Sequence, residues 1–123
     1  MGGRVTFLVA GHVALGAAVG FYGGGVVTGR SEAMPSLLHL AASMRTPWLG
    51  LFGDGDGSIP VEDVETLRGA LDAGGGMDAS IVRYPDAQHG FHCDVRDSYD
   101  PAAAADGWRR TLDWLGGHLA PSD

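Results

Sequence analysis

The chain has 123 residues, 45% of them hydrophobic, and a formal net charge of -7, which is typical of one small globular domain and not of a disordered segment. Its 15 acidic residues outnumber its 8 basic residues, so we expect no nucleic-acid partner, because phosphate binding needs clustered cations. The one cysteine, Cys93, excludes an intramolecular disulfide and a multi-cysteine zinc site. The apolar stretch at residues 5–19 is broken by glycines and is shorter than the ~20 residues of a membrane span, so we expect a cytoplasmic protein with no membrane partner.

Helical and extended patterns alternate along the chain. In chain order they predict a helix or a buried strand at residues 4–12, a strand at 17–22, a short helix at 36–44, a strand at 48–52, a helix at 61–73, a strand at 79–84, and a helix from Asp100 to Gly116. Strands that alternate with helices predict an α/β fold with a parallel sheet of about three strands and helices on both faces. Nothing marks a domain boundary, so residues 1–123 are expected to form one unit.

Two of the predicted helices carry further signals. Val64, Leu67 and Leu71 share one face of the helix at 61–73, which indicates its buried side. Asp100 followed by Pro101 is typical of a helix start, with aspartate as the N-cap. Trp108 and Trp114 in the last helix are expected in the core. His12, His39 and His118 are expected to be solvated or to cap helix ends.

An acid and a base follow two neighbouring strands of the predicted sheet. Asp56 lies in the glycine-rich turn after residues 48–52, and His89 lies in the loop after residues 79–84. Because the carboxyl ends of parallel strands meet at one edge of a sheet, these side chains are expected to lie together. A carboxylate that orients an imidazole is the arrangement of a hydrolase with a Ser or Cys nucleophile, in the chain order acid then base. Asp54 competes with Asp56 for the acid's role.

Four sequence segments resemble the dienelactone hydrolase family. They are FYGG at 21–24, PWLGLFGDGDGSIP at 47–60, YPDAQHGF at 84–91 and SYDPAAAADGWRRTL at 98–112. The resemblance implies the C-terminal half of an α/β-hydrolase domain, without its N-terminal strands. It implies Asp56 as the catalytic acid, His89 as the base and a small-molecule ester or lactone as substrate, with no cofactor. Tyr22 and Phe91 are expected to line the substrate pocket, with packing in the core as the alternative for both. No metal is expected.

The first residues are similar to the family's nucleophile elbow. The chain begins Met1-Gly2-Gly3-Arg4, whereas the elbow of family members continues from a Cys nucleophile into Gly-Gly-Arg one residue later. The resemblance therefore implies that the chain starts just after the nucleophile. It also implies that the backbone N–H of Met1 contributes to the oxyanion hole.

Two alternative sites and one alternative function remain open. Cys93, four residues after His89, could replace the nucleophile, and His89, His92, Cys93 and Asp94 could bind a metal ion; a packed thiol and solvated side chains are the plainer interpretations. The alternative to ester or lactone hydrolysis is an inactive truncated hydrolase. Such a protein would act through homo-oligomerisation at an exposed sheet edge or apolar face.

Overall fold

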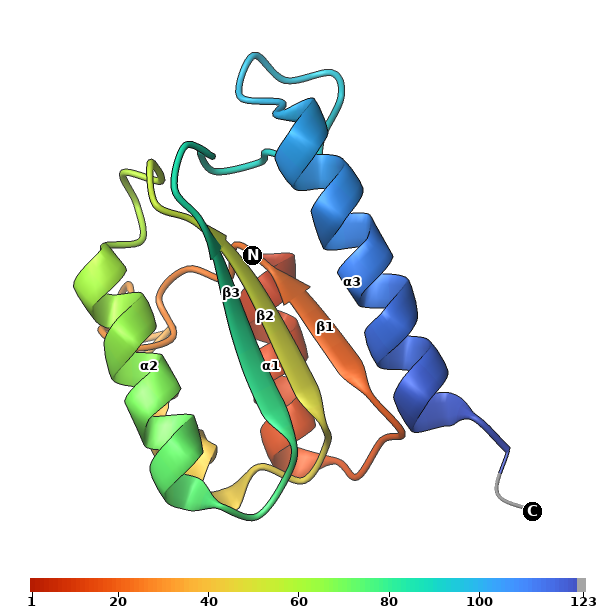
Figure 1. Ribbon diagram of the computed structural model, residues 1–123. Helices are drawn as coiled ribbons and strands as arrows, with labels where there is room; N and C mark the ends of the chain where they lie inside the picture. The colour runs from red at the N-terminus through yellow and green to blue at the C-terminus, as the bar shows by residue number, and fades with distance from the viewer. Residues whose placement is uncertain (122–123) are drawn as a thin grey trace.

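Three parallel strands form the centre of the protein. The computed structural model describes residues 1–121, and its sheet has the strand order β1–β2–β3 (Figure 1). The strands are β1 (Ala18–Phe21), β2 (Trp48–Gly53) and β3 (Ala79–Tyr84). Both strand pairs are parallel, with Trp48 of β2 beside Ala18 of β1 and beside Ala79 of β3. The predicted α/β fold with three parallel strands is confirmed, and each strand lies within a residue of its expected bounds.

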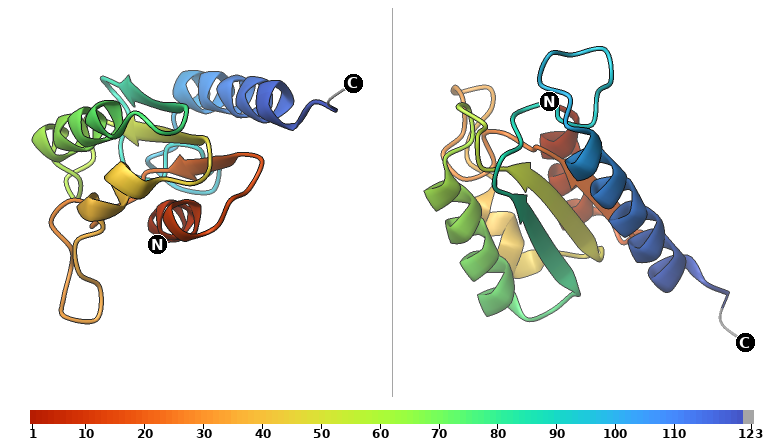
Figure 2. Two further views of the ribbon diagram at one scale, coloured as in Figure 1. Left: turned by 90° about the horizontal axis from the view of Figure 1, so that it is seen from below. Right: turned by 45° about the horizontal axis from the view of Figure 1, so that its top comes forward.

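Helices cover both faces of this sheet. They are α1 (Gly2–His12), the 3-10 helix η1 (Leu38–Ser43), α2 (Val61–Gly74) and α3 (Pro101–Leu119). Helix α1 and helix α3 lie on opposite sides of the sheet (Figure 2). One core joins α1, η1 and α2 to the sheet around Phe7, Trp48 and Leu67, and a second core joins α3 to it around Leu51.

Helix α1 resolves the segment that the sequence left open between helix and strand. Phe7 and Ala10, three residues apart, are both fully buried, and the Phe7 ring meets the Trp48 ring edge-on at a centroid distance of 5.0 Å. The helix also comes unusually close to β1, since a Cβ added at Gly3 would lie 2.5 Å from the carbonyl oxygen of Phe21. Only glycine permits that approach, which brings the start of α1 to the carboxyl end of β1.

The predicted signals in α2 and at the start of α3 are confirmed. Val64, Leu67 and Leu71 are the buried residues of α2, and the helix ends at Gly75 in the left-handed conformation with a φ of 60°. The Asp100 side chain accepts a hydrogen bond of 3.0 Å from the backbone N–H of Ala103 and caps α3. Helix α3 runs to Leu119, three residues beyond the expected end at Gly116. An exposed glycine inside a helix lowers the stability of the helix by only about 1 kcal/mol relative to alanine, so it need not end the helix.

The prediction that Trp108 belongs to the core is wrong. Trp108 is 51% exposed, because α3 faces the sheet with Ala103, Gly107 and Thr111. These small residues let the helix lie close to β2, so the large indole is turned outward. Trp114 is partly buried and packs against the second core, as expected.

The remaining histidines lie at the surface or near a helix end. His12 and His39 are exposed, and the His118 imidazole contacts the backbone carbonyl oxygen of Trp114 at 2.8 Å and the carboxylate of Asp78 at 2.9 Å. Within residues 1–121, none of the helices combines the length and the apolar character needed to cross a membrane.

Candidate active site

Asp56 and His89 meet at the carboxyl ends of β2 and β3. The Oδ2 atom of Asp56 lies 2.6 Å from Nδ1 of His89, and Asp56 is buried while His89 is half-buried. The turn after β2 passes close to the turn after β3, because the backbone N–H of Gly55 donates to the carbonyl of Ala87 at 2.9 Å. A Cβ at Gly53 would lie 2.3 Å from that same carbonyl oxygen, so glycine is required where the two turns touch.

The carboxylate of Asp56 is held by a second set of contacts. The hydroxyl and the backbone N–H of Ser58 both donate to Oδ1 of Asp56, at 2.6 and 2.9 Å. Burial raises the pKa of Asp56, but the hydrogen bonds from Ser58 and His89 outweigh it, and the pKa lies below its usual value. Asp56 is therefore a carboxylate at neutral pH, which can orient an imidazole and stabilise its protonated form.

Asp54, the competing acid, is engaged elsewhere. Its two carboxylate oxygens accept hydrogen bonds of 2.8 and 2.7 Å from Nε and Nη2 of Arg83, which lowers the pKa of Asp54. The structure thus brings Asp56, and not Asp54, to His89.

The loop that carries His89 is fixed by Ser98 and by glycine. The Ser98 hydroxyl donates to the backbone carbonyl of His89 at 2.7 Å. Gly90, directly after His89, has a φ of 81°, a conformation that side-chain-bearing residues rarely adopt. The spacing of residues in the sequence does not predict the hydrogen bond from Ser98. The glycine directly after His89 does indicate a sharp turn.

Of the two expected pocket residues, only Tyr22 lies at the surface of the site. Tyr22 is half-buried, its ring centroid is 4.8 Å from that of His89, and burial raises the pKa of its hydroxyl. Phe91 is completely buried and packs against Phe21, Tyr22 and Tyr84. The expectation that Phe91 lines the pocket is corrected: its ring belongs to the second core, under the site.

Two cavities border His89, and Met1 borders both. The first has a volume of about 450 Å³ and the second about 330 Å³, within the usual range for small-molecule sites. The first is lined by Met1, Gly2, Gly3, Thr6, Val19, Phe21, Tyr22, His89, Cys93 and Arg96, and the second by Met1, Arg4, Gly24, Arg30, Ser58 and His89. The N-terminus of α1 therefore lies beside the imidazole, where its helix dipole favours negative charge.

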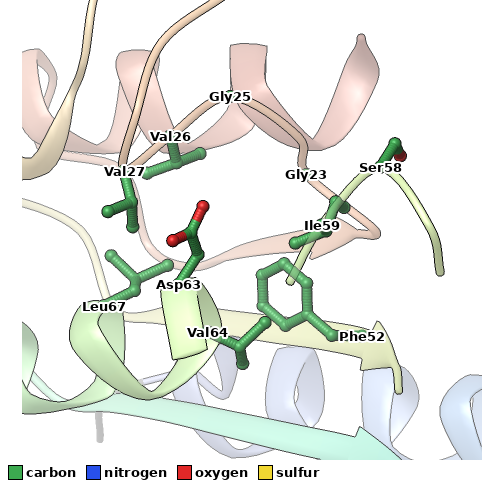
Figure 3. A pocket seen from close by; sticks show the side chains of 10 residues that line it. All are labelled: Gly23, Gly25, Val26, Val27, Phe52, Ser58, Ile59, Asp63, Val64 and Leu67. Carbon is green, nitrogen blue, oxygen red and sulfur yellow. The ribbon is translucent and has the colours of Figure 1, made fainter. Parts of the chain in front are cut away.

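A third pocket, beside the turn that carries Ser58, is too small for a substrate. It lies between residues 23–27 and α2, with Phe52, Ile59 and Leu67 among its apolar lining residues (Figure 3). Its volume of about 10 Å³ has room for about one water molecule.

Cys93 and the possible metal ligands gain no support. Cys93 is half-buried and lines the larger cavity, but within residues 1–121 no hydrogen bond joins its sulfur to His89. In the same part of the chain no three His, Cys, Asp or Glu side chains come together as metal ligands. His92 instead stacks on Phe21, at a centroid distance of 4.8 Å.

Arginines contribute to the site in a way that the sequence reasoning missed. The buried Arg4 donates to the carbonyl oxygens of Gly25 and, at 2.6 Å, of Pro35, and so holds the loop after β1. Arg30 and Arg96 each border one of the cavities beside His89. Among the described residues, the guanidinium groups of these two make neither a hydrogen bond nor an ion pair. Of these three arginines, only Arg4 could have been singled out from the sequence, because it is a cation at the start of an otherwise apolar helix.

Relatives of known sequence match nearly all of the chain. A relative from Escherichia coli (strain K12), described as "Putative carboxymethylenebutenolidase", is 46% identical over 119 residues, covering 93% of this chain and 42% of the relative. A relative from Yersinia pestis with the same description is 44% identical, covering 95% of this chain and 44% of the relative. The chain thus spans less than half the length of these curated relatives.

Solved structures and a family model agree with these matches. A Klebsiella pneumoniae structure, described as "Putative Dienelactone Hydrolase", superposes with a TM-score of 0.85 and 44% identity, over 93% of this chain and 48% of that one. An esterase of Pyrococcus furiosus shares the fold, with a TM-score of 0.73 over 98% of this chain and 51% of that one at 16% identity. The model of the "Dienelactone hydrolase family" matches residues 1–119. The chain belongs to the dienelactone hydrolase family.

Proposed function

We propose that this chain supplies the acid and the base for hydrolysis of a small-molecule ester or lactone, and that the nucleophile comes from a part of the full-length protein outside these 123 residues. The observation that carries the proposal is the 2.6 Å contact between Asp56 Oδ2 and His89 Nδ1 beside a cavity that Met1 also borders. With Nδ1 engaged by Asp56, Nε2 of His89 is free to exchange a proton with a nucleophile.

The reaction proceeds through an acyl-enzyme. A Cys or Ser that lies next to Met1 gives its proton to His89 and attacks the substrate carbonyl carbon. The resulting oxyanion is stabilised by the backbone N–H of Met1 at the start of α1. The intermediate expels the alkoxide or enolate leaving group, which takes the proton from the His89 imidazolium. Water, deprotonated by His89, then releases the acid and restores the nucleophile.

A substrate with an anionic group fits the walls of this site. Arg30 and Arg96 border the two cavities next to His89, and their guanidinium groups have no hydrogen-bonding partner among residues 1–121. Arginine pairs readily with a carboxylate, and a cation without a partner in a chain of net charge -7 is available for one. The E. coli and Y. pestis relatives are described as "Putative carboxymethylenebutenolidase", the name of an enzyme that acts on a carboxymethylene-substituted butenolide.

The test compares the 123-residue chain with a version extended upstream through the nucleophile. Turnover of p-nitrophenyl esters and of an enol-lactone by the extended protein is expected. It should fall about 10⁶-fold in His89→Ala and about 10⁴-fold in Asp56→Asn. His39→Ala removes an exposed histidine of η1 and serves as the matched control. The proposal is wrong if the extended protein hydrolyses neither substrate, or if His89→Ala keeps its turnover.

A non-catalytic homo-oligomer is the second candidate, and a specific observation favours it. In residues 1–121, β1 pairs only with β2, so the other edge of β1 has no strand beside it. Val5, Leu8 and Val9 on α1 are partly exposed, as are Trp108 and Leu112 on α3. Unpaired edges and exposed apolar side chains favour association between copies. Light scattering at micromolar concentration should then detect a dimer or a larger assembly; a monodisperse monomer would exclude this candidate.

A further inference from the structure

The two oxygens of the Asp56 carboxylate have separate partners. Oδ2 contacts Nδ1 of His89 at 2.6 Å, while Oδ1 accepts hydrogen bonds only from Ser58 among the described residues, from its hydroxyl at 2.6 Å and its backbone N–H at 2.9 Å. Asp56 is only 4% exposed, so water has little access to either oxygen. The orientation of the carboxylate is thus set by one residue on each side.

Ser58 is itself held in place by the turn it belongs to. The backbone N–H of Asp56 donates to the carbonyl of Gly53 at 3.2 Å, and the N–H of Ile59 donates to the carbonyl of Asp56 at 3.2 Å. Ile59 is buried, with its side chain beside Phe52 and below Ser58 (Figure 3). The buried Ile59 and these backbone hydrogen bonds fix the main chain on both sides of Ser58, and the hydroxyl and backbone N–H of Ser58 both face Oδ1 of Asp56.

We propose that Ser58 is a positioning residue of the hydrolytic site: its hydroxyl fixes the rotation of the Asp56 carboxylate so that Oδ2 faces Nδ1 of His89. The catalytic role of this positioning rests on the proposed function, whereas the hydrogen bond between Ser58 and Asp56 is independent of it. Rotation of an aspartate carboxylate about its last bond is otherwise broad. With Oδ1 tied to Ser58, Oδ2 keeps the imidazole in the tautomer that carries its proton on Nδ1, which leaves Nε2 as the proton acceptor.

The first test needs no nucleophile and uses the 123-residue chain. Carbon-13 NMR of carboxyl groups reports the pKa of Asp56, and nitrogen-15 NMR of imidazoles reports the tautomer of His89. Ser58→Ala keeps the backbone N–H but removes the hydroxyl, so the Asp56 pKa is expected to rise by roughly one unit. The share of the Nδ1–H tautomer of His89 is expected to fall. Ser58→Thr keeps a hydroxyl and should restore both signals.

Ser98→Ala is the matched control. It also removes one serine hydroxyl near His89, but that hydroxyl donates to the backbone carbonyl of His89 and does not contact Asp56. The Asp56 pKa should stay at its wild-type value in this variant. Dispersed amide signals in each variant would establish that the chain remains folded.

Three results would overturn the inference: an Asp56 pKa in the wild-type chain that is not depressed, unchanged signals in Ser58→Ala, or an equal change in Ser98→Ala. The first does not depend on any variant folding. In the upstream-extended enzyme, Ser58→Ala should lower kcat roughly tenfold with little change in KM. If the NMR signals change as expected and the extended enzyme is inactive, the positioning role stands and the proposed hydrolysis fails. If His89→Ala abolishes turnover while Ser58→Ala leaves the NMR signals and kcat unchanged, the proposed hydrolysis stands and the positioning role of Ser58 is wrong.

Discussion

The ring of Tyr22 lies 4.8 Å from the imidazole of His89, and Tyr22 is the one non-glycine residue with a positive φ, 37°, in residues 1–121. A side-chain-bearing residue in this conformation is strained by about 1 kcal/mol or more. The strain is retained because Tyr22 immediately follows β1 and its ring packs against Phe91 as well as His89. The strained backbone at Tyr22 thus places an aromatic ring beside the imidazole of His89.

The strain at Tyr22 predicts an unusual order of stability for two truncations. Tyr22→Ala and Tyr22→Gly lose the same ring contacts, but only alanine keeps the strained backbone. We expect Tyr22→Gly to be more stable than Tyr22→Ala by about 0.5–1 kcal/mol, although glycine normally costs more backbone entropy. Urea unfolding of both variants measures this difference. The opposite order would mean that the backbone at residue 22 relaxes without cost.

The contact between the two site turns predicts opposite effects of alanine at two glycines. A Cβ at Gly53 would lie 2.3 Å from the Ala87 carbonyl oxygen, whereas at Gly69, in the exposed part of α2, it would meet nothing within 4 Å. Gly53→Ala should lower the free energy of unfolding by about 1–3 kcal/mol, because backbone must move. Gly69→Ala should raise it by about 0.5–1 kcal/mol through helix propensity. Thermal unfolding checks both, and an unchanged Gly53→Ala variant would contradict the close contact.

His118 predicts a pH-dependent contribution to stability. The carbonyl of Trp114 and the carboxylate of Asp78 raise the pKa of His118 in the folded chain. The stabilisation by this histidine should be complete below its unfolded pKa of about 6.5 and should disappear as the pH rises through the higher folded value. The unfolding free energies of wild type and His118→Gln should therefore differ more in mild acid than in mild base. An equal difference between the two proteins in acid and in base would contradict this contribution.

Arg30 and Arg96, which border the two cavities and have no side-chain partner within residues 1–121, predict charge selectivity in the upstream-extended protein. Arg96→Gln should raise KM roughly tenfold for an ester that carries a carboxylate and leave a neutral ester of the same size nearly unaffected. Arg45→Gln is the control, since Arg45 is exposed and, within residues 1–121, its side chain donates only to the carbonyl of His12, at 3.5 Å. Steady-state kinetics on the two esters measures the ratio. Equal losses on both esters would assign Arg96 a structural role instead.

The strands and the proximity of Asp56 to His89 could be predicted because both depend on the pattern of apolar residues along the chain. Buried parallel strands are short apolar runs, so β1, β2 and β3 stand out between glycine-rich turns. Asp56 and His89 each follow such a run, and parallel strands place those positions at one edge of the sheet.

Other features depended on tertiary packing that local sequence does not encode. Trp108 is exposed because α3 approaches the sheet through Gly107. The helical periodicity of the sequence instead favours a buried Trp108, since it is the largest apolar side chain in that part of the helix. Phe91 lies in the core because its loop turns back under the site. The hydroxyl of Ser58 reaches Asp56 only through the dihedral angles of one turn, which residue types do not determine.

The parallel register of the sheet also bears on how fast the chain folds. Ala18 pairs with Trp48, and Trp48 with Ala79, so each pairing joins residues about thirty positions apart. No strand pair can form as a local hairpin, and each must wait for the intervening chain to close a loop whose entropy is lost before any pairing energy is gained. We expect helices α2 and α3, whose hydrogen bonds are local, to form earlier, and the strand edges to be open to association with other chains until they pair. Because the contact between Asp56 and His89 depends on the same connectivity, we expect it to form late in folding.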